Sequence, residues 1–318
     1  MTDRADGPPP DPRRGTAYGA AAYLLWGLFP LYWPLLEPAG AVEILAHRIV
    51  WSLLVVLALL AATRSWSWVR PLLRDRTTLR RMSLAAVLIA TNWVIYIWGV
   101  NAGHVVETSL GYFVTPIVMV LLGVVVLHER LRRVQWAAIG LGALAVVVLT
   151  VDYGRPPWIA LGLAASFGTY GLLKKRVGAT VGAVQSLTVE TAVLVLPALG
   201  YLMVLEARGS GHFGHVGAGH ELLLASTGVV TAVPLLLFAS SARRVPLSVL
   251  GLLQYIAPVL QLLTGVLLYD EPMPPSRLAG FAVVWVALAV LSVDGLRHRG
   301  PSGRARASDP VEATPVVS

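Results

Sequence analysis

Three ionisable residues interrupt the apolar stretch AVEILAHRIVW and are the strongest candidates for chemistry in this chain. Glu43 and His47 are four positions apart and therefore share a helix face, with Arg48 beside them. An arginine near the centre of a membrane-spanning helix costs about 2.5–3.5 kcal/mol on insertion. We therefore expect Arg48 to face a watery cavity or a carboxylate. The alternative is a structural ion pair or a side chain that reaches the membrane interface, which fits Glu43 better than Arg48.

A second apolar stretch carries Glu190, at a position that an internal repeat makes equivalent to His47 and Arg48. We expect Arg48 either to bind an anionic group of a substrate or to pair with Glu190. His47 and Glu190 are the candidate proton carriers. A buried structural pair is an equal alternative for Glu190.

Other polar and aromatic side chains in the apolar stretches are predicted to shape a substrate pocket. They are Trp51, Asn92, Tyr96, Tyr112, Thr115, Gln254, Tyr255 and Gln261. Amide and hydroxyl groups in such stretches also hydrogen-bond to neighbouring helices, so helix packing is the alternative for this set. Pro116 and Pro258 stand at equivalent points of the repeat, and the alternatives are a kink in both helices that exposes carbonyls to a cavity and a role in helix packing.

The remaining polar groups favour structural roles. The segment GHFGHVGAGHE, with His212, His215 and His220, fits a flexible external loop better than a metal site. Glu129 and Glu271 are predicted to cap the N-termini of the apolar stretches that follow them. The chain contains no nucleotide-binding, metalloprotease or serine hydrolase motif, so we predict no enzyme activity, no cofactor and no metal.

The composition indicates what must position these residues. Hydrophobic residues make up 56% of the 318 positions and charged residues only 13%, which is too little polar surface for a soluble protein of this length. Apolar runs of about 20 residues have the length needed to cross a bilayer as helices. The net charge is +8, but the basic residues lie in short clusters between these runs, which argues against a nucleic-acid partner. With no cysteine, disulfides and thiolate chemistry are excluded.

We predict an all-α polytopic membrane protein with ten transmembrane helices. The expected spans are 16–36, 41–62, 80–101, 105–127, 133–151, 157–173, 181–205, 221–241, 247–269 and 276–295. Ten spans place most lysines and arginines on one side of the membrane, and the positive-inside rule makes that side and both termini cytoplasmic. The tails, residues 1–15 and 296–318, are predicted to be disordered and cytoplasmic.

Residues 104–152 align without a gap with residues 246–294. The aligned pairs include Pro116 with Pro258, Gly123 with Gly265, Glu129 with Glu271 and Asp152 with Asp294. We infer two five-helix repeats, residues 16–152 and 153–295. Because five is odd, the second repeat enters the membrane from the opposite side, and inverted repeats typically place a substrate site near the midplane.

Four stretches carry a family resemblance: AYLLWGLFPLYWPLL, EILAHRIVWS, NWVIYIWGVNAGHVVETSLGYFVTPIVMVLLGVVVLHERL and QYIAPVLQLLTGVLLYDEP. They resemble the RarD-type EamA permeases of the drug/metabolite transporter superfamily, over about residues 15–295. The resemblance implies ten helices in two inverted halves and a bacterial inner-membrane secondary transporter. Asparagine is common in that family where Thr115 stands. This difference weakens any inference from the substrates of family members to the substrate of this chain.

We predict a secondary active transporter that exports a small metabolite or drug-like compound, coupled to protons, by alternating access between the repeats. Its predicted partners are the small-molecule substrate, protons and the lipid bilayer. The sequence leaves undecided whether the protein forms a homodimer. The alternatives are an uncoupled facilitator and a non-transporting sensor or scaffold. A membrane enzyme acting on lipid would need paired carboxylates or a His–Asp set at one depth, and the sequence shows none.

Overall fold

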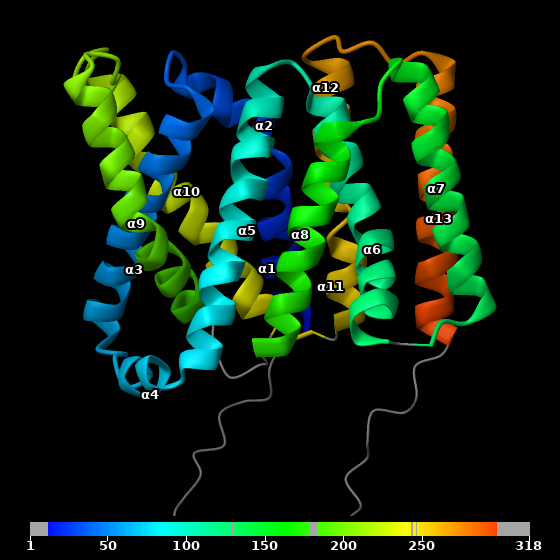
Figure 1. Ribbon diagram of the computed structural model, residues 1–318, viewed down its shortest axis with the longest axis horizontal. Coiled ribbons are helices and arrows are strands. Elements are labelled where there is room, and N and C mark those ends of the chain that lie inside the picture. Colours follow the sequence, from blue (N-terminus) through cyan, green and yellow to red (C-terminus); the bar gives the residue numbers. More distant parts are fainter. Residues whose placement is uncertain (1–11, 129, 178–182, 243, 246, 298–318) are drawn as a thin grey trace, which may run out of the picture.

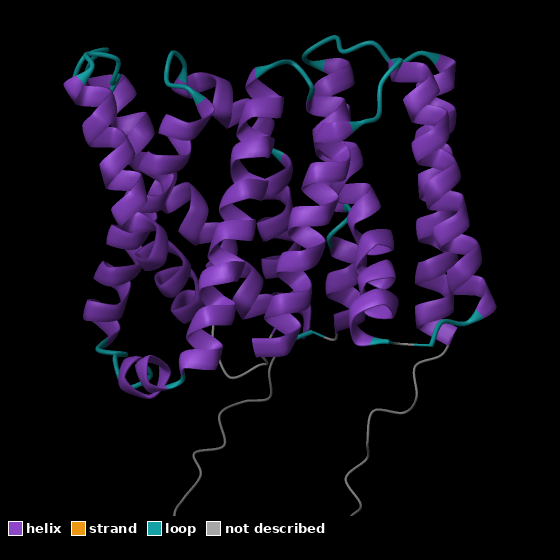
Figure 2. Cartoon of the chain, in the orientation of Figure 1, coloured by secondary structure: helices purple, strands orange, loops and turns teal. Residues whose placement is uncertain are grey.

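The computed structural model describes residues 12–128, 130–177, 183–242, 244–245 and 247–297, and this part of the chain contains helices, turns and loops but no strand (Figure 2). The helices are α1 (Pro12–Gly27), α2 (Phe29–Tyr32), η1 (Trp33–Leu36, a 3₁₀ turn), α3 (Ala41–Thr63), α4 (Val69–Arg74), α5 (Arg76–Asn101), α6 (Val105–Leu127), α7 (Arg133–Tyr153), α8 (Trp158–Val177), α9 (Ala183–Ala207), α10 (Ala218–Ala242), α11 (Leu247–Leu253), α12 (Ile256–Leu267) and α13 (Pro275–Arg297). The first helix thus begins four residues before the predicted span.

The first predicted span is broken by proline. Its two parts, Pro12–Gly27 and Phe29–Leu36, meet at an angle of 43°. Pro30 has no backbone N–H and cannot donate to the carbonyl of Trp26 one turn earlier. The Nε2 of Gln261 donates to that carbonyl instead, at 3.2 Å. Gln261 therefore replaces a helix hydrogen bond that the sequence of the first span cannot make.

The two repeat-equivalent prolines have different effects. Pro258 lies just after a break between α11 and α12, whereas Pro116 lies inside α6, which continues without interruption. The helix is thus interrupted beside Pro258 and not at Pro116, and a bend of α6 at Pro116 stays a prediction. The helix break follows the surroundings of each proline, because a missing hydrogen bond does not by itself end a helix that is well packed.

Seven of the described helices are long and apolar enough to cross a membrane, and the bent pair of α1 with α2 and η1 would be an eighth. They are α3, α5, α6, α7, α9, α10 and α13, in part with one to three residues trimmed from an end. The α12 helix is apolar but shorter. These findings establish an all-helical membrane protein, while the count of ten spans stays a prediction.

Successive long helices run in alternate directions between two ends of the bundle (Figure 1). The upper end carries the loops 37–40, 102–104, 154–157, 208–217 and 268–274, and the lower end carries α4, Pro12 and Arg297 (Figure 1). The main packing pairs are α3 with α9 and α10, α1 with α10 and α12, α8 with α5 and α6, α7 with α13, α6 with α12, and α5 with α9.

Ion pairs hold the antiparallel helices α7 and α13 at both ends. At the upper end Arg277 donates from Nε to Asp152 Oδ2 at 2.8 Å, and at the lower end Arg132 pairs with Asp294. Asp152 and Asp294 are equivalent in the sequence repeat. Asp152 of α7 therefore binds an arginine of α13, and Asp294 of α13 binds an arginine that directly precedes α7.

Capping differs from the sequence-based expectation at Glu271. Its carboxylate accepts from the backbone N–H groups of Val105 and Val106, the second at 2.8 Å, and so caps α6 rather than the following helix α13. Burial raises the pKa of Glu271, while the two backbone hydrogen bonds act in the opposite direction. The capped helix is distant in sequence because the loop folds across the upper end. Glu129 lies outside the described residues.

Candidate functional site

Arg48 lies inside the bundle with only 3% of its surface exposed. Its Nε donates to Thr231 Oγ1 of α10 at 2.8 Å. Among the residues that the structure describes, no carboxylate lies within ion-pair distance of it. A buried charge is normally paired, so this guanidinium is a special case that calls for a physical account.

Aromatic rings surround the guanidinium. Its Cζ lies 3.8 Å from the ring centre of Trp93, 5.2 Å from that of Trp33 and 5.9 Å from that of Phe29. Phe29 and Trp33 come from the bent end of the first span, and Trp93 comes from α5. We call Arg48 with Phe29, Trp33, Trp93 and Thr231 the Arg48 cage. Ring faces attract the cation but accept few of its hydrogen bonds.

Polar atoms without partners gather near this cage. Trp33 Nε1 and Tyr96 OH are buried and have no hydrogen-bond partner in the structure. On α3, the next turn adds His47 Nε2, Trp51 Nε1 and Ser52 Oγ. Groups of this kind are rare in protein interiors, and each needs a physical explanation, of which a bound ligand or water is one.

The loop 208–217 folds down onto the upper part of α3. Glu43 accepts from the backbone N–H of His212 at 2.8 Å and contacts its Nδ1 at 2.7 Å. This places Phe213 against two predicted site residues, with its ring 5.0 Å from His47 and 6.1 Å from Trp51. The sequence predicted a flexible external loop, and the structure adds that this loop packs against the site residues at the upper end.

The three histidines of this region have separate partners. His212 contacts Glu43, His215 Nε2 contacts Glu206 Oε1 at 2.8 Å, and His220 Nε2 contacts the carbonyl of Leu36 at 2.9 Å. Within the described residues, no group of three or more acidic or histidine side chains is arranged to hold a metal ion.

Glu190 does not pair with Arg48, which corrects one of the two predicted roles. Its Oε1 lies 2.9 Å from Lys174 Nζ and 2.9 Å from Ser186 Oγ, and Tyr170 OH donates to it at 3.3 Å. Counted at 1.5 Å per residue, Arg48 lies about 6 Å above the centre of α3 and Glu190 about 8 Å below the centre of α9. Inversion therefore separates the two groups along the membrane normal.

Two predicted pocket residues belong to a network between α5, α6 and α8. Asn92 Nδ2 donates to the carbonyl of Leu163 and to Ser166 Oγ, both at 3.1 Å, and Tyr112 OH donates to Asn92 Oδ1 at 3.2 Å. The Tyr112 ring meets Tyr96 edge-on at 5.5 Å. This network positions Tyr96 beside the Arg48 cage, and it serves helix packing as well.

The other predicted residues lie apart from the cage. Thr115 Oγ1 donates to the carbonyl of Gly111 in its own helix at 2.9 Å. Gln254 and Tyr255 lie at the break between α11 and α12 and are half-buried. Gln261 binds the carbonyl of Trp26, so these three positions belong to the discontinuous helices, and none of them is part of the Arg48 cage.

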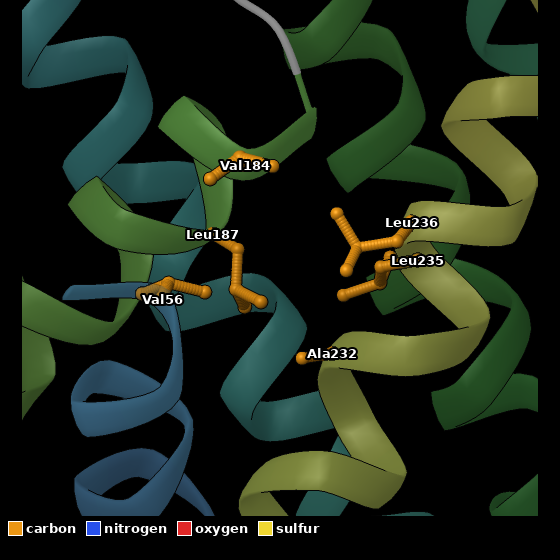
Figure 3. A pocket seen from close by; sticks show the side chains of 6 residues that line it. All are labelled: Val56, Val184, Leu187, Ala232, Leu235 and Leu236. Carbon is orange, nitrogen blue, oxygen red and sulfur yellow. The ribbon is translucent and has the colours of Figure 1, made fainter. Parts of the chain in front are cut away.

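A small apolar pocket lies below the cage, between α3, α9 and α10 (Figure 3). The side chains of Val56, Val184, Leu187, Ala232, Leu235 and Leu236 converge on it. Val56 lies two turns below Arg48 on α3, and Ala232 follows Thr231 on α10. The pocket therefore lies on the lower side of the site, opposite to the loop 208–217.

Sequence reasoning missed Phe29, Trp33, Trp93, Phe213 and Thr231. Aromatic rings in apolar stretches carry no pattern that separates a binding role from packing. Only Trp93, next to Asn92, stood beside a polar position that had been selected.

The sequence pattern of the EamA-like transporter family matches residues 13–151 and matches again at residues 156–293. A protein named RarD from Streptomyces exfoliatus is 57% identical over 306 residues, which cover 96% of this chain and 96% of that protein. The uncharacterized transporter YojE of Bacillus subtilis is 43% identical, covering 91% of this chain and 97% of YojE. A crystal structure with 19% sequence identity matches with a TM-score of 0.55 over 89% of this chain and 98% of its own chain, a likeness of fold alone.

Proposed function

Because the chain belongs to the EamA-like transporter family and is a multi-pass bacterial membrane transporter rather than an enzyme, we propose that it exports a small metabolite or drug-like compound by secondary active transport. The observation that carries this proposal is the buried Arg48, a charge without a carboxylate partner near the middle of the described bundle. A structural arginine would normally be neutralised, whereas one that binds a substrate is neutralised by its cargo.

The proposal includes ten spans in two inverted repeats, with both termini in the cytoplasm. Two matches to one family pattern support the repeat, and the opposite chain directions of α3 and α9 and of α7 and α13 support inversion (Figure 1). The upper end holds few basic residues, among them Arg155, Arg208 and Arg277, which favours its placement outside. In this arrangement α8 and the pair α11 and α12 complete the ten spans.

Alternating access would close the substrate path at one end while opening it at the other. The contact of Glu43 with His212 supports a closed upper end. The titratable His47 and Glu190 support proton coupling. An uncoupled facilitator, or a sensor or scaffold that does not transport, is the competing function.

The test is a comparison of the culture medium of cells that express wild-type protein, Arg48→Ala or empty vector at matched membrane levels. We expect at least one compound to accumulate outside only with the wild type. If wild type and empty vector give the same medium in hosts that supply diverse metabolites, export is wrong. For coupling, purified protein in liposomes should respond to an imposed pH gradient, and an unchanged rate would favour the facilitator.

A further inference from the structure

The Arg48 cage contains more hydrogen-bond donors than the protein satisfies. A guanidinium has five N–H groups, and among the described residues the hydrogen bond that Arg48 makes is the one from Nε to Thr231. Trp33 Nε1, another donor-only group, is buried at the cage without a partner. Tyr96 OH is also buried without one and lies within electrostatic range of Arg48. The missing partner is therefore an acceptor.

The charge of the cage indicates the charge of that partner. Arg48 is the one cation in the cage, and the groups around it are aromatic rings and hydroxyls. A single positive charge in a low-dielectric setting is best matched by a single negative charge. A dianion such as a phosphate monoester would bring a second, unmatched charge into the bundle.

The geometry indicates the shape of the partner. Arg48 Cζ lies over the Trp93 ring at 3.8 Å from its centre, and the planar guanidinium directs its N–H groups in its own plane. A carboxylate is planar, accepts only, and can take two of these N–H groups side by side. The rings of Phe29 and Trp33 then form an apolar wall for the rest of the molecule.

We propose that the Arg48 cage binds the carboxylate of an organic monoanion with an apolar body, and that the transported substrate belongs to this class. The inference rests on the proposed transport function. It assigns binding to Arg48, with Trp33 Nε1 and Tyr96 OH as further donors to the carboxylate, and it leaves the identity of the apolar body open to the experiment.

The experiment uses purified full-length protein and a panel of monocarboxylates with aromatic, branched or straight apolar bodies, such as phenylacetate. Each acid is paired with its neutral amide, and phenethylamine serves as a cation. Binding is measured by tryptophan fluorescence and by the shift in Tm. We expect at least one acid to bind about tenfold or more tightly than its amide, with this preference lost in Arg48→Met and retained in Arg74→Met, an exposed arginine of α4.

The inference is overturned if no acid is preferred over its amide, or if Arg48→Met keeps the preference. The Tm of Arg48→Met without any ligand is a second measurement that does not depend on the choice of acid. We expect it to be higher than that of the wild type, because the variant removes an unneutralised buried charge. A clear fall would mean that the cage itself satisfies the guanidinium, which contradicts an anion site.

Failure of the inference and failure of the transport proposal can be distinguished. If wild-type cells export compounds that are neutral or cationic, export stands and the anion site is wrong. If they export nothing relative to empty vector, export is wrong, while the binding measurement still decides whether the cage takes a carboxylate.

Discussion

At the scale of single residues, the two buried charges Arg48 and Glu190 have opposite surroundings. Arg48 contacts rings and one hydroxyl, whereas Glu190 binds Lys174, Ser186 and Tyr170. The neutralised charge is suited to hold helices together, and the unneutralised one is suited to take a ligand. A proton role for Glu190 would therefore require the Lys174 pair to rearrange during transport.

The Glu190 pair gives a prediction about stability. Lys174→Met leaves a buried carboxylate without its cation and should cost on the order of 2–3 kcal/mol, less than a fully buried pair because Lys174 is 30% exposed. The double variant Lys174→Met with Glu190→Gln should recover most of this loss. Thermal unfolding in detergent measures both. Equal losses in the single and double variants would contradict the pairing.

At the scale of elements, the loop 208–217 and the broken helices α1–α2 and α11–α12 shape the site. Discontinuous helices leave backbone carbonyls without helical donors, as at Trp26, and other side chains then bind them. The bend at the end of α1 also carries Phe29 and Trp33 to Arg48. The loop covers the same region from above through Phe213.

The loop gives a prediction about access. The chain has no cysteine, so Ser52→Cys, a buried position on α3, provides a single reporter. Adding Glu43→Leu removes both contacts to His212 and should raise the rate of labelling by a membrane-impermeant thiol reagent several-fold.

Glu206→Leu is the matched control for this experiment, because it removes the exposed contact to His215 on the same loop. It should leave the labelling rate of the Ser52→Cys reporter near that of the reporter alone. A rate that is unchanged by Glu43→Leu would show that the loop does not restrict access to the site.

At the scale of the whole molecule, the two halves contact each other through pairs of antiparallel helices. The ion pairs Asp152–Arg277 and Asp294–Arg132 lie at opposite ends of the α7–α13 pair. Among the described residues, most Lys and Arg positions belong to segments at the lower end, which also holds α4, the start of α1 and the end of α13 (Figure 1). Charge and inversion therefore favour one orientation in the membrane.

This orientation predicts the sidedness of single cysteines. Val216→Cys, in an upper loop, should react with an impermeant thiol reagent on intact cells, because it is exposed and faces outward. Trp66→Cys, between α3 and α4, should react only after the membrane is opened. The reverse pattern would overturn the orientation, and equal labelling of both on intact cells would overturn the topology.

The sequence by itself determined the membrane class, the all-helical character and the transporter family, because hydrophobic length and repeated motifs are properties of local segments. It also singled out Arg48, since a charge in an apolar run is costly wherever the run folds. Only the tertiary structure decided that Lys174 takes Glu190, that Glu271 caps α6 and that Phe213 packs on His47. These contacts join segments far apart in the chain or set the depth of a group along the membrane normal, and neither is encoded in the spacing of residues along one helix.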